Sequence, residues 1–290
     1  MKTVLIDSHC HLHDREFFTE EQAETMLKRA RKKNVKKIIC IGTDPEDSFV
    51  ARDFAMAHDD VYWTYGIHPE NANNLVAEPC SGSRRSLPFA FGNSRPKGRA
   101  PRGSRANPRA AALRNPLRQG TSTKLVAIGE VGLDYHYEGY DREAQIKLFE
   151  EMLQLAKDND LPVSFHVREA FDDFFAVVKN FPEVRGVVHS FTDSKKILKR
   201  ILNETGFYVG VNGLATYSTL PTPPLERILL ETDAPFLTPT PFRGIINEPG
   251  YVYEVAQWLS RNLAVDFEII EEETTNNAER LFCFPDSVLR

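Results

Sequence analysis

The sequence has no long apolar run. No stretch of the 290 residues approaches the ~20 consecutive apolar residues that a membrane-spanning helix needs. The first ten residues include Asp7 and His9 and hold no apolar segment of the kind that directs secretion. We therefore expect a cytoplasmic protein that does not interact with a membrane.

Cysteine is also scarce. The four cysteines, Cys10, Cys40, Cys80 and Cys283, lie far apart, and no pair has the CxxC spacing of zinc or redox sites. This pattern argues against a disulfide-stabilised scaffold, and we expect reduced, mostly buried thiols.

Acidic residues are nearly absent from one segment, residues 77–122. It holds ten Lys and Arg residues but a single acid, Glu78, and so carries a charge of +9. The net charge of the chain is −5, which leaves −14 on the remaining residues. An acidic body of this kind argues against nucleic-acid binding through a broad basic face.

The same segment has no helical or strand periodicity. It is rich in Arg, Pro and Gly, and its Pro and Gly residues prevent a long helix. Irregular segments of this length are uncommon within compact domains and are usually functional or disordered. We expect residues 77–122 to be a mobile insertion. The alternatives are a nucleic-acid-binding arm and a stretch derived from translated non-coding or mis-framed sequence.

Outside the insertion, apolar strand-like runs alternate with amphipathic helical segments. Eight strands are predicted, at residues 3–7, 36–42, 61–68, 125–129, 162–165, 186–188, 207–213 and 228–230. Helices are predicted at residues 20–34, 45–58, 142–158, 171–180, 194–203, 248–262 and 267–281. Apolar runs without polar alternation are typical of parallel strands that are buried on both faces.

This rhythm predicts an α/β fold, a (β/α)8 TIM barrel that forms one domain over residues 1–290. Without the insertion, 244 residues remain, close to the ~250 of a typical barrel. A doubly wound open sheet is the alternative, but it would gather side chains from distant strands less easily.

The seventh βα unit is predicted to be shortened. Pro221, Pro223 and Pro224 disfavour a helix between the last two strands, although parallel crossovers usually contain one. We expect an extended strap over residues 217–224, poorly covered barrel surface beneath it, and reduced stability.

Residues that suit a divalent metal ion stand at the ends of the predicted strands. They are His9, His11, Glu130, His166, His189 and Asp233. A parallel barrel brings the carboxyl ends of all its strands to one face, so ligands scattered along the chain can converge there. Imidazole and carboxylate groups are the usual ligands of Zn²⁺ and related ions. Any one of these residues is weak evidence, but the six together predict a metal site.

Four other polar residues lie at or beyond the ends of predicted strands. His68 and Arg168 are candidates to bind a substrate phosphate, because a guanidinium offers a fork to two phosphate oxygens. Asp134 is a candidate acceptor for the N–H of a histidine ligand. His13 lies past the first strand, and we expect it at the surface.

Several short motifs together resemble the TatD family of metal-dependent deoxyribonucleases, which are amidohydrolase-like TIM barrels. They are residues 7–11 (DSHCH), 66–69 (GIHP), 130–134 (EVGLD), 166–168 (HVR), 189–191 (HSF), 231–235 (ETDAP), 247–249 (NEP) and 276–278 (NNA). The resemblance covers nearly the whole chain except residues 77–122 and 217–224. One departure is Asp193, near which the family usually has a glycine.

The resemblance implies a site for two divalent metal ions, Mg²⁺, Mn²⁺ or Zn²⁺. One would be held by His9, His11, Glu130 and Asp233. The other would be held by His166 and His189, with Glu130 bridging the two ions. Asp233 and Glu130 would be the catalytic residues, with Asp233 orienting the attacking water. The implied activity is hydrolysis of DNA phosphodiesters, often from the 3′ end.

Other functions remain open at this point. The same ligands suit hydrolysis of esters, lactones or D-aminoacyl-tRNA, because a barrel fold does not select the substrate. An inactive descendant that binds nucleic acid through residues 77–122 is a further alternative. We expect no organic cofactor and a monomer whose partner is its DNA substrate.

Overall fold

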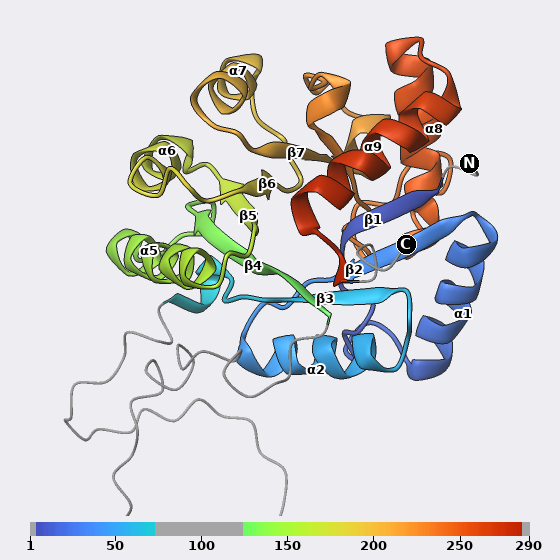
Figure 1. The fold of residues 1–290 in the computed structure, drawn as a ribbon, viewed down its shortest axis with the longest axis horizontal. Coiled ribbons are helices and arrows are strands. Elements are labelled where there is room, and N and C mark those ends of the chain that lie inside the picture. Colours follow the sequence, from blue (N-terminus) through green and yellow to red (C-terminus); the bar gives the residue numbers. More distant parts are fainter. Residues whose placement is uncertain (1–3, 73–123, 286–290) are drawn as a thin grey trace, which may run out of the picture.

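The computed structural model describes residues 4–72 and 124–285, and the predicted insertion at residues 77–122 lies outside them. Eight parallel strands follow one another in sequence order around a barrel, as predicted (Figure 1). They are β1 (Leu5–Cys10), β2 (Val35–Cys40), β3 (Val61–Tyr65), β4 (Leu125–Asp134), β5 (Val163–Arg168), β6 (Gly186–Val188), β7 (Tyr208–Val211) and β8 (Ile228–Leu230).

The barrel closes between its first and last strands. Cys10 and Ala234 form a parallel bridge beyond the end of β8. On either side of it, the His11 amide donates to the Ala234 carbonyl at 2.8 Å and the Asp233 amide donates to the His9 carbonyl at 2.8 Å. The end of β1 and the segment after β8 therefore meet at the seam, and this pairing brings His9, His11 and Asp233 together.

Helices surround the barrel (Figure 1). They are α1 (Glu20–Lys32), α2 (Pro45–Met56), α5 (Arg142–Asp158), α6 (Phe171–Val178), α7 (Lys195–Glu204), α8 (Val252–Leu263) and α9 (Phe267–Phe282). Thr19, Asp44, Asp141 and Ser194 cap the first turns of α1, α2, α5 and α7 by accepting backbone N–H groups. No helix in residues 4–72 and 124–285 is long and apolar enough to cross a bilayer.

Alternating strand residues supply two separate apolar layers. Leu5, Ile38 and Val61 pack with the surrounding helices in the larger cluster. Their neighbours Ile6, Ile39 and Tyr62 belong to a second cluster, which contains residues of α9 but of none of the other helices. Successive side chains of a strand point to opposite faces, so the second cluster fills the barrel interior.

β4 is longer than predicted. It continues past Gly129 to Asp134 because Val131 to Asp134 pair with Phe165 to Arg168 of β5. Glu130 and Asp134 therefore lie within the strand rather than after it. Their side chains hold fixed positions in a paired backbone, which suits residues that must meet a ligand at a defined place.

The connection between β7 and β8 contains no α-helix, as predicted. It consists of the short 3₁₀ turns η3 (Gly213–Thr216) and η4 (Leu225–Arg227) joined by the strap of residues 217–224. The expected exposure of the barrel surface beneath it is wrong, because Val209 is fully buried and Val211 is 8% exposed.

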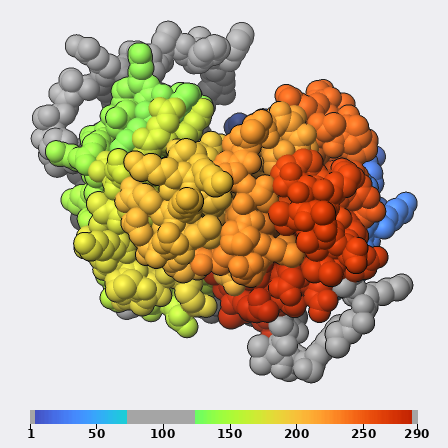
Figure 2. Space-filling model, turned by 90° about the horizontal axis from the view of Figure 1, so that it is seen from above, coloured from blue at the N-terminus to red at the C-terminus, as the bar shows by residue number. Residues whose placement is uncertain are grey.

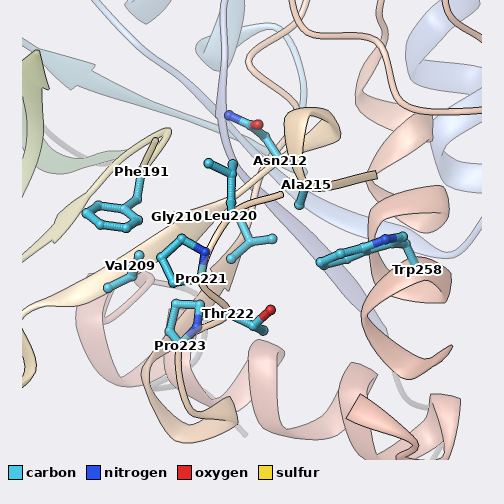
Figure 3. A pocket seen from close by; sticks show the side chains of 11 residues that line it. Phe191, Val209, Gly210, Asn212, Ala215, Leu220, Pro221, Thr222, Pro223 and Trp258 are labelled. Carbon is cyan, nitrogen blue, oxygen red and sulfur yellow. The ribbon is translucent and has the colours of Figure 1, made fainter. Parts of the chain in front are cut away.

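Figure 3 shows what covers this surface. Leu220 and Pro221 of the strap lie over β7, and Trp258 of α8 stands beside them. They leave a cavity of only about 20 Å³. In the space-filling view, the orange part of the chain and the red helices form one continuous surface (Figure 2).

The described cysteines have free thiols. Cys10 and Cys40 are buried and paired in register on β1 and β2, whereas Cys283 is exposed. The expectation of mostly buried, unbridged cysteines agrees with these three residues.

Candidate metal centre

The six predicted metal ligands converge at the carboxyl ends of the strands. His9 is in β1 and His11 just beyond it, Glu130 is in β4 and His166 in β5. His189 follows β6, and Asp233 follows β8. All except His9 line an open pocket of about 550 Å³, and His9 is buried beneath it.

Four donor groups surround one point. Nε2 of His9 lies 3.6 Å from Glu130 Oε2 and 3.6 Å from Asp233 Oδ1. Nε2 of His11 lies 3.9 Å and 3.6 Å from the same two oxygens. These separations are too long for hydrogen bonds, and His9 Nε2 has no hydrogen-bond partner among the described residues.

The other oxygen of Glu130 faces a second set of imidazoles. Its Oε1 lies 2.8 Å from His166 Nδ1 and 3.0 Å from His189 Nε2. Nε2 of His68 is 3.9 Å from the same oxygen. A single carboxylate therefore stands between two groups of histidines, one at each oxygen.

This donor set fits divalent cations. Donors placed about 2.1 Å from a tetrahedral ion lie roughly 3.4 Å apart, close to the separations around His9 and His11. A buried nitrogen without a partner is costly, and a cation bound by His9 Nε2 would remove that cost. Two groups able to hold an ion share Glu130: His9, His11 and Glu130, and His68, Glu130 and His166.

Other groups fix the orientation of the imidazole rings. Nδ1 of His11 lies 3.1 Å from the Ile41 carbonyl, and Nδ1 of His9 lies 3.3 Å from Ser164 Oγ. Nε2 of His166 lies 2.8 Å from Asp134 Oδ2, the kind of contact predicted for Asp134. A partner on one ring nitrogen leaves the other free to face a cation.

The electrostatics favour ionised carboxylates at this site. Burial disfavours the charge on Glu130, but the charge of His189 and the hydrogen bonds from His166 and His189 hold its pKa well below the usual range. Burial likewise opposes the charge on Asp233, and the contact with His11 lowers its pKa. Two ionised carboxylates among four imidazoles form a site for positive charge.

His68 and Arg168 line the same pocket. Burial lowers the pKa of His68 to about 4, so the ring is neutral at neutral pH. Its distance from Glu130 makes it a candidate ligand as well as the predicted substrate contact. The Arg168 guanidinium lies 5.3 Å from the centre of the Tyr137 ring and donates to its hydroxyl at 3.3 Å.

Two buried acids near the site had no predicted role. Asp7 accepts from the Thr232 amide at 2.9 Å and from its hydroxyl at 2.7 Å, and it joins β1 to the segment that carries Asp233. Glu231 is fully buried, accepts from the Ser190 amide at 2.6 Å, and lies 3.5 Å from His189 Nδ1. Each stands two residues before a predicted ligand, and this spacing was the available signal.

The prediction that His13 lies at the surface is wrong. Its side chain is completely buried, and its Nε2 lies 2.9 Å from Asp47 Oδ1 at the start of α2. This contact joins the turn after β1 to the first turn of α2.

The chain is similar to known proteins along nearly its whole length. The family model described as TatD related DNase matches residues 6–283. An uncharacterized metal-dependent hydrolase of Bacillus subtilis, YabD, is 30% identical over 96% of this chain and 99% of its own. The 3′-5′ ssDNA/RNA exonuclease TatD of Erwinia tasmaniensis is 31% identical over 89% of this chain and 93% of its own.

Solved structures show the same fold. YJJV, a TatD homolog from Escherichia coli K12, has a TM-score of 0.77 and 27% identity, covering 96% of this chain and 98% of its own. A TatD family hydrolase from Entamoeba histolytica has a TM-score of 0.78 at 21% identity, covering 98% of this chain and 99% of its own.

Proposed function

Because this chain belongs to the TatD family of metal-dependent hydrolases, we propose that it is a deoxyribonuclease that hydrolyses phosphodiester bonds, removing nucleotides from the 3′ end. A relative with 31% identity carries the name 3′-5′ ssDNA/RNA exonuclease, which supports this substrate class. The observation that carries the proposal is the placement of Glu130, whose two oxygens face two separate groups of histidines.

The residues divide into two groups of ligands. His9, His11, Asp233 and one oxygen of Glu130 would hold the first ion, and His166, His189 and the other oxygen of Glu130 would hold the second. Divalent ions supply a polarised phosphoryl oxygen and a water of lowered pKa when they are bound at such a site.

The remaining steps fall to side chains. Asp233 lines the pocket and is ionised, so it orients the attacking water and accepts its proton. Arg168 binds the non-bridging phosphate oxygens through its guanidinium fork. His68 is neutral near pH 7, and its ring N–H donates to the phosphate or to the leaving oxygen.

A Glu130→Ala variant tests this proposal. The substitution removes the acceptor shared by both ligand groups, so the bound Mn²⁺ should fall from two ions to none. Hydrolysis of an oligodeoxynucleotide should fall by more than about a hundredfold, since the loss of a ligand exceeds the 10–100-fold effect of a supporting residue. Metal content by mass spectrometry and digestion of 5′- and 3′-labelled strands measure the two effects. Glu150→Ala, an exposed site on α5, is the matched control.

Four results would contradict the proposal. Unchanged hydrolysis in Glu130→Ala would exclude the bridging role, and activity that survives chelation would exclude metal dependence. Hydrolysis of p-nitrophenyl acetate in preference to bis(p-nitrophenyl) phosphate, with Mn²⁺ present, would favour an esterase or lactonase. An inactive nucleic-acid-binding descendant would show metal-independent DNA binding that weakens steeply with salt and disappears on deletion of residues 77–122.

A further inference from the structure

Two exposed phenylalanines stand on the wall of the metal pocket. Phe17 and Phe236 line it, and their side chains are 43% and 46% exposed. Their ring centres lie 5.2 Å apart at an angle of 81°, an edge-to-face contact. Large apolar side chains usually avoid this degree of exposure, and when they gather beside a polar site they often mark a binding surface.

The backbone holds both rings in place. The Phe236 amide donates to the Asp233 carbonyl at 2.8 Å, and its carbonyl accepts from the buried side chain of Asn247 at 2.6 Å. On the other side of the seam, Phe18 is buried and its amide donates to the Asp14 carbonyl at 3.0 Å. The backbone at Phe236 and beside Phe17 is therefore held by hydrogen bonds, and the two rings contact each other edge to face.

The large apolar side chains of the pocket gather near the seam of the barrel. Phe17 and Phe236 follow β1 and β8, which are neighbours at the seam, whereas His68 follows β3 and Arg168 ends β5. Leu214 and Leu237 extend the apolar side. A volume of about 550 Å³ falls in the usual range of ligand pockets, roughly 300–1,000 Å³. A nucleotide combines a flat apolar base with a charged phosphate.

We propose that Phe17 and Phe236 form a platform on which a nucleobase beside the scissile phosphate stacks. This inference rests on the proposed nuclease function and adds the residues that would bind the base. Every base has a π-face, so stacking tolerates any sequence. A base in a duplex is already stacked on its neighbours and paired, so the platform favours unpaired strands.

The test compares two substrates in the same Mn²⁺-loaded enzymes. One is a short oligodeoxythymidylate, and the other is the same strand with the bases removed from its 3′-terminal dinucleotide. The measured quantity is the ratio of kcat/KM for the natural strand to kcat/KM for the abasic strand. This ratio does not depend on the fraction of enzyme that is folded, so a partly unstable variant remains informative.

Phe17→Ala and Phe236→Ala should each lower this ratio about tenfold, the typical effect of losing one base–aromatic contact. Phe236→Leu should lower it to a similar extent, because it keeps apolar volume but removes the π-face, whereas Phe236→Tyr should keep it. Ile269→Ala, which removes a 45% exposed apolar side chain on α9 outside the pocket, should leave it unchanged.

Two failures are distinguishable. An active enzyme whose ratio is the same in the Phe17, Phe236 and Ile269 variants overturns the platform and leaves the nuclease proposal standing. An unaltered protein that cleaves neither strand, with Mn²⁺ bound, overturns the nuclease proposal and the platform with it.

Discussion

Asp134 and Glu130 hold the imidazole of His166 from opposite sides. Oδ2 of Asp134 lies 2.8 Å from Nε2, and Oε1 of Glu130 lies 2.8 Å from Nδ1. A neutral imidazole has one N–H and one lone pair. Burial opposes a charge on His166, but the contacts of its two nitrogens with Asp134 and Glu130 raise its pKa. A cation held at Nδ1 would use the lone pair of that nitrogen and leave the hydrogen on Nε2, where Asp134 accepts it. Asp134 therefore acts through the ring of His166 and is a positioning residue.

Replacing Asp134 with alanine should weaken the binding of the second ion. We expect about a 10–100-fold loss of Mn²⁺ affinity at that position, with a parallel loss of hydrolysis at limiting metal. Asp134→Asn should lose less, because its amide oxygen still accepts a hydrogen bond but carries no charge. Calorimetric titration of the metal-free protein measures both affinities.

The first ion provides the internal control for Asp134. Its affinity should remain within about twofold in both variants, since none of its proposed ligands is supported by Asp134. Glu138→Gln, which neutralises an exposed acid in the loop after β4, should change neither ion. An equal loss of affinity for both ions would indicate a general loss of structure rather than a loss of the orientation of His166.

The convergence of the ligands was predictable because it depends on topology. A parallel barrel places every strand end at one face, so the strand-terminal positions of His189 and Asp233 were sufficient to predict their meeting. The seventh connection was predictable for a local reason, since Pro221, Pro223 and Pro224 exclude a helix. Both inferences need only the order of elements and the backbone limits of single residues.

What the sequence did not predict depends on contacts between distant residues. His13 is buried because Asp47, 34 positions away, meets its ring. The length of β4 depends on pairing with β5. The surface beneath the strap is covered partly by Trp258 of α8, which no local pattern relates to β7. Side-chain partners of this kind follow from the assembled fold.

The pair formed by His13 and Asp47 should stabilise the fold within a limited pH range. Partial burial would raise the pKa of Asp47, but the hydrogen bond with His13 lowers it from 3.8 to about 2. Burial would lower the pKa of His13, but the contact with Asp47 raises it from 6.5 to about 9. The contribution of Asp47 is lost as pH falls through about 2, and that of His13 as pH rises through about 9.

Asp47→Asn should therefore lower the free energy of unfolding by about 2 kcal/mol between pH ~4 and ~6.5. The difference from the unaltered protein should shrink towards pH ~2 and above pH ~9. Urea denaturation of both proteins across this pH range measures the difference in unfolding free energy. Asp53→Asn, which removes a 70% exposed acid from the same helix, should change stability by no more than about 0.5 kcal/mol. A pH-independent difference for Asp47→Asn would contradict the ion pair.

Asn277 should be the main polar anchor of the segment between β7 and β8, which contains no α-helix. It is fully buried in α9, and its side-chain amide donates to the Leu225 carbonyl at 2.9 Å and to the Ile228 carbonyl at 3.0 Å. These carbonyls belong to η4 and to the start of β8. Leucine cannot donate a hydrogen bond, so both carbonyls lose this donor in a buried environment. Asn277→Leu should therefore lower the free energy of unfolding by about 1–3 kcal/mol.

The loss of stability in Asn277→Leu should also be local. Hydrogen exchange of residues 217–227 should accelerate in Asn277→Leu more than exchange in β1 to β4, because the two hydrogen bonds join η4, which follows the strap, and the start of β8 to α9. Asn262→Ala offers a matched control, since Asn262 also donates to the strap, at Thr222 Oγ1, but from an exposed position. Its cost should stay within about 0.5 kcal/mol. If Asn262→Ala destabilises the protein as much as Asn277→Leu, the strap is held by its surface contacts and the buried amide is not its anchor.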